Sequence, residues 1–516
     1  CSACIAGEVP RAIIAGDMKG AEEAILWHKR VFGDDFYLEV QQHKTEIPGQ
    51  SQEVYEHQLI ANEGIFLLAE KTGTKVVATN DIHFVRKEDG PAHDRLICLT
   101  TNANVDDPER LRYTQQEYMK SEEEMLDMFY KHPEAISKTI EVAEKITSYK
   151  VDKDPILPKF DLPEEFLKDI DMYLEKYKGI IDEGRCDKSG NERGEEFCRS
   201  VAYLCHLTYQ GAHWRYGETL SDEQAERIEF ELKTICKMGF PDYFLIVQDF
   251  INSARNELGV WVGPGRGSAA GSVVAYCLGI TRLDPIKYDL LFERFLNPDR
   301  ISLPDIDTDF DDDGRGKVLQ WVMDKYGAEN CAHIITYSTM ATKNSLKDVA
   351  RIEKVPLDKA NALCKAIPER LSLDGKDLKM NLSNAIKCTP ELQQAEASTD
   401  PALSNTIKYA RMLEGNIRGT GIHACGFIIC RDPISEHVPV STADDPDFPG
   451  EKTAVTQYDG HVIESTGLIK MDFLGLKTLS EMKEACRVIK EAHGIEIDPD
   501  SLPIDDELTY KLYQEG

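Results

Sequence analysis

The sequence predicts a multidomain chain of mixed α/β and α+β type, and three observations support this prediction. The chain has 516 residues, which is too long for one hydrophobic core and suggests about three domains. Residues 1–105 alternate between helical and strand-like segments. Farther along the chain, short strand-like segments are separated by helical runs.

The composition, with 41% hydrophobic and 29% charged residues, is typical of a soluble globular protein. The net charge of −31 argues against a wholly basic nucleic-acid coat, although a local basic stripe would still allow a nucleic-acid enzyme. The 14 cysteines lack disulfide-framework spacing and no apolar run is long enough for a membrane span, so we expect free thiols in the cytoplasm. Because the chain starts at Cys1 and stops within a helical pattern, we interpret it as a fragment of a longer protein.

The alternating pattern is clearest in residues 1–105. Two segments place apolar residues at helical spacing, and each is followed by a short strand-like segment. We therefore expect an α/β domain with helices at 22–32 and 54–70 and strands at 36–40 and 74–79.

The second of these strands leads to two candidate metal ligands. Asp81 and His83 alternate onto one face at the carboxyl end of the strand, where α/β folds place their chemistry. Cys4 and His43 are further candidates. The simpler interpretation is that these are structural residues, because a lone His usually has ordinary neighbours and a single Cys-x-x-Cys is a weak zinc signal.

The middle of the chain is predicted to be mainly helical. Residues 106–158 are polar and helical, with mixed charge typical of solvent-facing helices, and the prolines of 152–163 indicate a linker. Residues 164–235 are also predicted to be helical. An amphipathic helix at 243–258 and a short strand at 259–262 follow.

A glycine-rich loop occupies residues 263–272. Glycines allow close approach of the backbone to phosphate, and the helix expected behind the loop would favour an anion at its N-terminus. Arg266 and Ser268 would add hydrogen-bond donors. The loop is not a Walker A motif, since no Gly-Lys-Ser/Thr closes it, and a dinucleotide fingerprint is matched only weakly. The alternative is a tight turn packed against a helix of small residues.

Residues 304–310 are predicted to form a strand with Asp305, Asp307 and Asp309 on one face. Carboxylates this close repel one another, and they stay ionised together only with a cation between them or with good screening by water. Alone, the pattern would indicate a solvated acidic strand. The glycine-rich loop upstream and a strand Asp beside a Lys downstream instead favour metal-assisted phosphoryl transfer.

Two alternatives concern the surroundings of this acidic strand. Arg294 and Arg300 precede it, either as phosphate contacts or as partners in ordinary salt bridges. Residues 309–314 also match the first six positions of an EF-hand calcium loop, but the twelfth position is Gln320 and the preceding sequence is not helical. A helix at 316–326 and a strand at 332–337 are predicted next.

Residues 338–420 are predicted to be mostly helical. The first helix carries Lys343, Lys347 and Arg351, which would suit either a duplex backbone or solvent. A strand at 427–430 follows, and His423 before it is expected either to contact a ligand or to form part of a turn.

The last predicted strand, 467–475, places Lys470 and Asp472 on one face and apolar residues on the other. A surface salt bridge on an edge strand is one explanation. A phosphate contact beside a metal ligand explains the pair better, because packing gives no reason for two charges on an otherwise apolar strand.

Together these stretches resemble the C-family DNA polymerases, the family of the bacterial replicative DNA polymerase III α subunit. The resemblance covers essentially the whole chain. The segments that carry it are 239–247, 263–272, 284–285, 292–298, 304–310, 335–341, 421–424 and 470–476.

The resemblance implies DNA-templated DNA synthesis by a palm with a polymerase β-like nucleotidyltransferase fold, interrupted by a helical thumb. Matched by motif, the catalytic aspartates are Asp305, Asp307 and Asp472, and two Mg²⁺ ions would lie among them. Asp309 is given no ligand role. The residues that match the triphosphate loop and the basic active-site positions are Arg266, Gly267, Ser268, Arg294 and Lys470.

The beginning of the chain resembles the polymerase-and-histidinol-phosphatase (PHP) domain of the same family, a distorted β/α barrel. Cys4, Asp81 and His83 match three of its ligand positions, while the leading His and Asp ligands are absent from this sequence. An intact PHP domain would bind Zn²⁺ or Mn²⁺ and is compatible with 3′-5′ exonuclease proofreading. We expect no such activity from the incomplete site.

The resemblance also implies partners and a location. We expect primer–template DNA and deoxynucleoside triphosphates as substrates, with the sliding clamp and other replisome subunits bound by regions missing here, no membrane association, and a cytoplasmic, nucleoid-associated protein. The implied domains are 1–158 (partial PHP domain with linker), 159–337 (palm, first part), 338–425 (thumb), 426–478 (palm, second part) and 479–516 (start of the fingers).

Two other functions compete with polymerisation. One is a PHP-type metal-dependent phosphoesterase or 3′-5′ exonuclease in which the palm is passive. The other is a calcium- or nucleotide-binding module without catalysis. Substitution separates them, because only a polymerase would need Asp307 for primer extension and only a PHP enzyme would need His83 for hydrolysis.

Overall fold

The computed structural model describes residues 1–516 except 157, 188, 298–303 and 504. The chain divides into two compact units, of which unit 1 contains Cys1–Tyr149 and Ser338–Gly419 and unit 2 contains Lys150–Tyr337 and Thr420–Gly516. Both units combine helices and strands, so the mixed α/β class is confirmed. Within the described part of the chain, no helix is long and apolar enough to cross a membrane.

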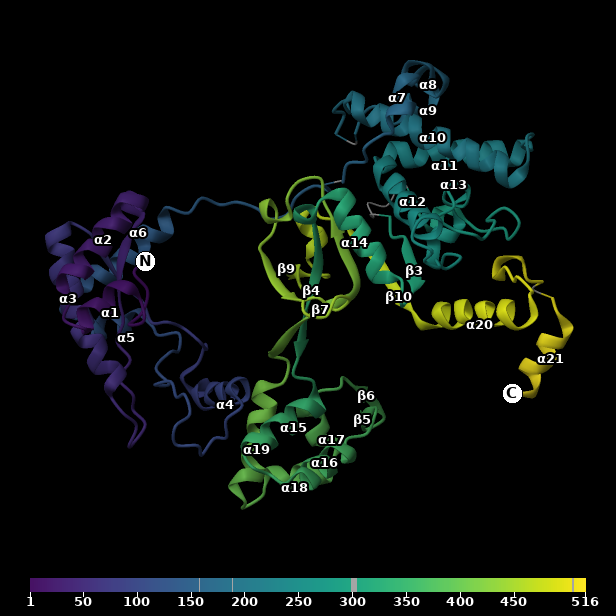
Figure 1. Ribbon diagram of the computed structural model, residues 1–516. Coiled ribbons are helices and arrows are strands. Elements are labelled where there is room, and N and C mark those ends of the chain that lie inside the picture. Colours follow the sequence, from purple (N-terminus) through teal and green to yellow (C-terminus); the bar gives the residue numbers. More distant parts are fainter. Residues whose placement is uncertain (157, 188, 298–303, 504) are drawn as a thin grey trace. The chain divides into compact units, whose positions relative to one another are not determined.

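Unit 1 begins with a small α/β layer (Figure 1). Its two strands pair in parallel, and helices pack on them around a core that includes Ile25, Leu38 and Ile65. A left-handed Gly73 ends the long third helix. The predicted helices and strands of this region are confirmed. The elements are α1 (Glu8–Ile14), α2 (Met18–Phe32), β1 (Tyr37–Val40), α3 (Glu53–Thr72), β2 (Lys75–Ala78), α4 (Gly90–Thr101), α5 (Glu122–Met128) and α6 (Pro133–Glu144).

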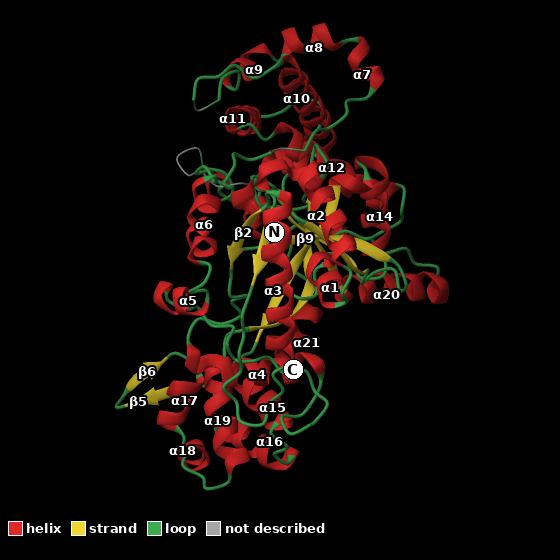
Figure 2. Cartoon of the chain, turned by 90° about the vertical axis from the view of Figure 1, so that its left-hand side faces the viewer, coloured by secondary structure: helices red, strands yellow, loops and turns green. Residues whose placement is uncertain are grey.

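The second part of unit 1 is the predicted helical region, with one small hairpin at its edge (Figure 2). Helix α4 packs on two of its helices, and Ala92 of α4 shares a core with Leu346 and Ile407. The elements are α15 (Thr342–Ile352), α16 (Leu357–Ala366), β5 (Leu371–Leu373), β6 (Lys376–Leu378), α17 (Leu382–Cys388), α18 (Pro390–Glu396) and α19 (Pro401–Leu413).

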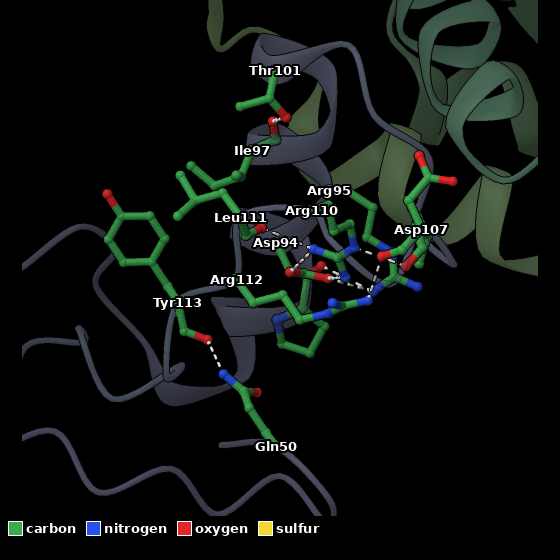
Figure 3. A network of polar contacts seen from close by, with 12 residues as sticks. Gln50, Asp94, Arg95, Ile97, Thr101, Asp107, Arg110, Leu111, Arg112 and Tyr113 are labelled. Atoms are coloured by element: carbon green, nitrogen blue, oxygen red, sulfur yellow. Dashed lines mark hydrogen bonds and ion pairs between the residues drawn. The ribbon is translucent and has the colours of Figure 1, made fainter. Parts of the chain in front are cut away.

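A network of arginines fixes the loop that follows α4 (Figure 3). Arg110 forms two hydrogen bonds of 2.7 Å to the carboxylate of Asp94 and a third, of 2.8 Å, to the carbonyl of Val105. Arg95 pairs at 2.9 Å with Glu353, the residue that follows α15. The helical prediction for 106–158 is therefore correct only for α5 and α6, because residues 102–121 form a loop held by these side chains.

Unit 2 begins with the predicted helical region (Figure 2). A capping box between Ser221 and Gln224 starts its fifth helix, and a left-handed Gly239 ends it. The strand predicted at 259–262 is wrong, since Val262 forms only an isolated bridge with Phe310. The helices are α7 (Glu164–Lys168), α8 (Ile170–Lys176), α9 (Lys178–Glu183), α10 (Glu195–Tyr216), α11 (Asp222–Met238), α12 (Pro241–Asn256) and α13 (Val273–Cys277).

A mixed six-stranded sheet with the order β3-β10-β7-β4-β9-β8 forms the centre of unit 2. Its outer strand β3 is parallel to β10, and β10 is antiparallel to β7. Strand β7 starts ten residues earlier than predicted, because its first half is rich in Gly, Arg and Thr and does not look like a buried strand. The elements are β3 (Asp307–Asp311), α14 (Arg315–Tyr326), β4 (Cys331–Thr339), β7 (Ile417–Ile429), β8 (Val440–Asp444), β9 (Lys452–Asp459), β10 (Lys470–Leu476), α20 (Lys477–His493) and α21 (Glu507–Glu515).

Short 3₁₀ turns connect several of these elements. Those in unit 2 include the turn that forms part of the glycine-rich loop. They are η1 (Gly33–Asp35), η2 (Lys87–Asp89), η3 (Gly267–Gly271), η4 (Phe292–Arg294), η5 (Ala328–Asn330), η6 (Ile434–Glu436), η7 (Ile463–Thr466) and η8 (Pro499–Ser501).

The two faces of the sheet have separate cores. On one face, Phe310 and Phe473 pack against Phe250 of α12, and Phe427 packs against Phe473. The other face buries Ile334, Ile428 and Leu468. The apolar residues predicted for β10 are thus buried as expected. The EF-hand alternative is wrong, because Asp309 to Asp311 lie in a strand and α14 begins before Gln320.

Candidate active site

Strands β3 and β10 are neighbours at one edge of the sheet (Figure 1), and three carboxylates come together there. Their parallel register places Asp472 opposite Asp307, and Asp305 lies two residues before Asp307 on the same face. One carboxylate oxygen from each of these three residues lies within 4.8 Å of the others. Asp305 itself precedes β3 rather than lying in it as predicted. We call Asp305, Asp307 and Asp472 the acidic cluster.

Asp472 is the buried member of the acidic cluster, with 6% of its surface exposed. Its Oδ2 lies 3.0 Å from Nζ of Lys470, and its Oδ1 is buried without a hydrogen-bond partner among the described residues. The edge-strand alternative is wrong, because β10 lies between β3 and β7. A buried carboxylate oxygen beside two further carboxylates is stabilised when a cation binds there.

Arg266 of the glycine-rich loop faces the acidic cluster. Its Nη1 and Nη2 donate to the two carboxylate oxygens of Asp307 at 3.0 and 3.1 Å, and its Nε donates to Asp309 at 3.2 Å. The backbone at Gly265 has φ +98°, and a Cβ there would lie 2.7 Å from Thr281. Only glycine suits this position, so the loop conformation that aims Arg266 depends on it.

The electrostatics of the acidic cluster follow from crowding and partial burial. Burial raises the pKa of Asp307, the charge of Arg266 opposes this shift, and the neighbouring carboxylates, Asp305 first, add to it. Burial alone would lower the pKa of Lys470, but its hydrogen bond and charge interaction with Asp472 outweigh that cost and raise it. Among the described residues, the ion pairs of the acidic cluster and of Asp309 are with two cations, Arg266 and Lys470, so these four carboxylates have two positive charges between them as ion-pair partners in that part of the site.

The short helix behind the glycine-rich loop does not present a free N-terminus. The buried carboxylate of Glu231 accepts hydrogen bonds from the backbone N–H of Val274 at 3.1 Å and from the hydroxyl of Ser272 at 2.8 Å. Arg227 completes the arrangement, donating to Glu231 at 2.7 Å and to the carbonyl of Gly271 at 2.9 Å. The expectation that this helix end would attract a phosphate is therefore wrong, since Glu231 already supplies the anion.

The remaining phosphate candidates are placed differently. Gly267 and Ser268 lie on the exposed side of η3. Arg294 is exposed at the end of η4, and within the described part of the chain no hydrogen bond or ion pair joins it to the acidic cluster. Arg300 lies outside the described residues. The structure thus brings Arg266 and Lys470 to the cluster but does not show Arg294 there.

The candidate ligands of unit 1 do not form a group comparable to the acidic cluster among the described residues. Nε2 of His83 lies 3.5 Å from Oδ1 of Asp81, and both residues are largely exposed. Cys4 joins no group of three or more ligand atoms with them among the described residues. His43 is buried between the carbonyl of Asn80 at 3.0 Å and the side chain of Gln58 at 2.9 Å, which favours the structural interpretation.

Several supporting residues were not identified from the sequence. Arg315, the first residue of α14, is buried and donates to the carbonyls of Phe473 and Ala424 at 2.7 and 3.1 Å, and it also pairs with Asp447. It ties β10 to β7 beside Asp472. His423, for which a ligand contact or a turn was expected, lies within β7, so the turn prediction is wrong; its ring accepts hydrogen bonds from the backbone N–H groups of Gly426 and Cys425.

Comparison with known proteins identifies the family. Residues 202–475 match the bacterial DNA polymerase III alpha NTPase domain family, and this match includes the glycine-rich loop and the whole acidic cluster. The chain belongs to this family. The DNA polymerase III α family resemblance predicted from the motifs is confirmed.

Individual DNA polymerase III α subunits match along the whole chain. The chain is 39% identical over 548 aligned residues to the DNA polymerase III subunit alpha of Thermus aquaticus, covering 100% of this chain and 43% of that protein. It is 38% identical over 521 residues to the subunit of Borreliella burgdorferi, covering 100% of this chain and 40% of that protein. The chain therefore spans about two fifths of the length of these relatives.

Proposed function

We propose that this chain contributes the catalytic palm of a bacterial replicative DNA polymerase, which extends a primer on a DNA template. The observation that carries the proposal is the gathering of Asp305, Asp307 and Asp472 within 4.8 Å, in a chain that belongs to the DNA polymerase III α family. We also propose a cytoplasmic, nucleoid-associated location, with clamp and replisome contacts made by regions outside this sequence.

The donor set of the acidic cluster fits a hard divalent cation. All of its donors are carboxylate oxygens, which suit Mg²⁺ better than softer metals, and the unpartnered Oδ1 of Asp472 is available to a cation. We propose that the three residues hold two Mg²⁺ ions. When bound, these ions would lower the pKa of the primer 3′-hydroxyl and stabilise the leaving pyrophosphate.

The residues of this chain have distinct roles in the proposal. Asp472 and Asp307, fixed opposite each other by strand register, set the spacing of the site. Arg266 carries the planar donor pattern that binds phosphate oxygens, and in the structure it neutralises Asp307 and Asp309. Lys470 forms an ion pair with Asp472 at 3.0 Å. We propose Gly267 and Ser268 as further triphosphate contacts and Arg294 as a contact made only with substrate bound.

We retain the domain assignment as a proposal: a partial PHP domain and linker at 1–158, a palm at 159–337 and 426–478, a thumb at 338–425 and the start of the fingers at 479–516. The grouping of residues 338–419 apart from the sheet of unit 2 supports an inserted thumb. An intact PHP domain, with Cys4, Asp81 and His83 completed by missing ligands, would bind Zn²⁺ or Mn²⁺.

Primer extension with Mg²⁺ and all four nucleotides tests the proposal. The samples are the full-length protein that contains this chain, the same protein with Asp307→Asn, and the same protein with Asp324→Asn, which removes an exposed carboxylate of α14. We expect extension by the first and third and none by the second, with DNA binding retained in all three. Equal extension by all three would refute the assignment of the acidic cluster.

A further inference from the structure

Unit 2 contains a second group of basic side chains. They contact the backbone of the loop and turn at residues 263–282, whereas Arg266 faces the acidic cluster. Arg215 of α10, Arg255 of α12 and Arg282 all bond to the backbone around residues 263–282, and we call these three residues the arginine cluster. Arg215 donates to the carbonyl of Thr281 at 3.4 Å, and Arg255 donates to the carbonyl of Gly279. The backbone N–H of Arg282 donates to the carbonyl of Pro264 at 2.7 Å.

The arginine cluster has less negative charge around it than positive charge. Within the described part of the chain, Arg215 and Arg255 form no ion pair, and the Nε of each is buried without a hydrogen-bond partner. Burial, followed by the charges of Arg282 and Arg215, lowers the pKa of Arg255 to about 9. Buried charges in proteins are normally paired, so this arrangement lacks an anion.

Two carboxylates lie near Arg282: Asp498, whose charge opposes the lowering of the Arg282 pKa by burial, and Asp500. Asp500 in η8 forms an ion pair with Arg282, the most exposed of the three arginines. Asp284, on the same loop as Arg282, is bonded instead to the hydroxyl of Tyr216 at 2.9 Å and to the backbone N–H of Ile286 at 3.0 Å. Asp498 and Asp500 both act on Arg282, and no ion pair reaches Arg215 or Arg255 among the described residues, so the cluster suits an anion with several acceptor oxygens.

A phosphate group has that chemistry. Its oxygens accept the paired N–H donors of guanidinium groups, and arginine is the usual residue for this contact. Trp214 lies beside the cluster, with its ring 4.8 Å from the guanidinium of Arg215 and 77% of its surface exposed. An exposed indole next to cationic side chains offers a stacking surface for a base.

We propose that Arg215, Arg255 and Arg282 form a second phosphate-binding site, and that Asp500 occupies part of it when no phosphate is bound. The phosphate belongs either to the backbone of single-stranded DNA or to a free phosphate compound such as pyrophosphate. The proposal does not rest on polymerase activity, because the arginine cluster contains none of the acidic cluster residues.

Binding experiments with this chain in EDTA test the proposal, since removing divalent ions removes metal-dependent phosphate binding at the acidic cluster. Isothermal titration calorimetry would use two probes, sodium pyrophosphate and a short single-stranded oligodeoxynucleotide without terminal phosphate. We expect Arg282→Gln and Arg215→Gln to weaken binding about tenfold. We expect Asp500→Asn to strengthen it, because the competing carboxylate is gone.

Matched controls make the result specific. Lys287→Gln removes a neighbouring exposed charge outside the cluster and should bind like the unmodified chain. An effect of the arginine substitutions on pyrophosphate alone identifies a free phosphate compound, and an effect on the oligonucleotide identifies a DNA backbone. Unchanged binding of both probes in Arg282→Gln and Asp500→Asn would overturn the proposal. If circular dichroism shows that Arg215→Gln does not fold, the variants Arg282→Gln and Asp500→Asn, at exposed positions, still decide the outcome.

Discussion

The acidic cluster of unit 2 and the Asp81–His83 pair of unit 1 contain similar ligand types but are built differently. Asp307 and Asp472 lie on paired strands, and Asp472 is buried and held by Lys470. Asp81 instead lies outside a strand, with φ +45°, and its contact to the exposed His83 is 3.5 Å. In unit 2, strand pairing fixes the distance between Asp307 and Asp472, and no such pairing fixes Asp81 and His83.

The largest expected effect in this comparison belongs to Asp472→Asn in the full-length protein. This change removes a buried charge from the acidic cluster, and loss of several kcal/mol of metal-mediated stabilisation corresponds to about a thousandfold slower primer extension. Single-turnover extension would measure it. Mn²⁺ binding to this chain, followed by electron paramagnetic resonance, should weaken in parallel. Extension at the unmodified rate would show that Asp472 is no ligand.

Arg266→Gln should have the next largest effect. The change removes charged donors to phosphate, each worth about 1.5–3 kcal/mol, so the KM for nucleotide should rise at least about tenfold. Steady-state extension over a range of nucleotide concentrations would measure KM. Lys317→Gln, an exposed charge on α14, is the matched control and should leave KM unchanged. An unchanged KM in both variants would remove Arg266 from the proposed triphosphate contacts.

A pH series should show a smaller effect that depends on the same arginine. The pKa of Asp307 is raised by burial and held down by Arg266, so its carboxylate protonates at a higher pH than an ordinary aspartate as the solution is acidified. Mn²⁺ binding should therefore weaken on the acid side, and in Arg266→Gln this weakening should begin at higher pH. The two titration curves would coincide if Arg266 did not influence Asp307.

The smallest effect is expected for His83→Ala. The incomplete group in unit 1 should not hold a metal in this chain, so Mn²⁺ affinity should stay within about twofold of the unmodified value, which is below 1 kcal/mol. The same titration as for Asp472→Asn measures it. A loss of bound Mn²⁺ comparable to that in Asp472→Asn would make the two regions equivalent and contradict the comparison.

Much of the fold followed from local sequence patterns. The helices near residues 22–32, 54–70 and 316–326 and the strand at Lys470 were predicted because apolar periodicity is a local property. The strand predicted at 259–262 was wrong because pairing depends on a partner, and only Val262 finds one. The early start of β7 was missed because it is set by the neighbouring strands rather than by its own glycine-rich sequence.

Some features of the candidate site could likewise be predicted from local sequence, and others depend on residues far away in the sequence. The position of Asp307 in a strand and the Lys470–Asp472 contact on one strand face were predicted from alternation, whereas Asp305 lies just before the strand. The roles of Glu231 and Arg315 could not be predicted, since their partners are backbone groups and side chains far away in the sequence. A buried Arg or Glu resembles any surface charge until its partner is known.

The register of β3 and β10 determines whether a folded chain contains the acidic cluster. Side chains alternate along a strand, so a shift of β10 by one residue would turn Asp472 toward the apolar core and Met471 toward Asp307. Such a chain could retain most of its secondary structure and still have no metal site. Folding yield and active fraction are therefore separate quantities for this protein, and preparations with identical circular dichroism spectra can differ in the number of competent molecules.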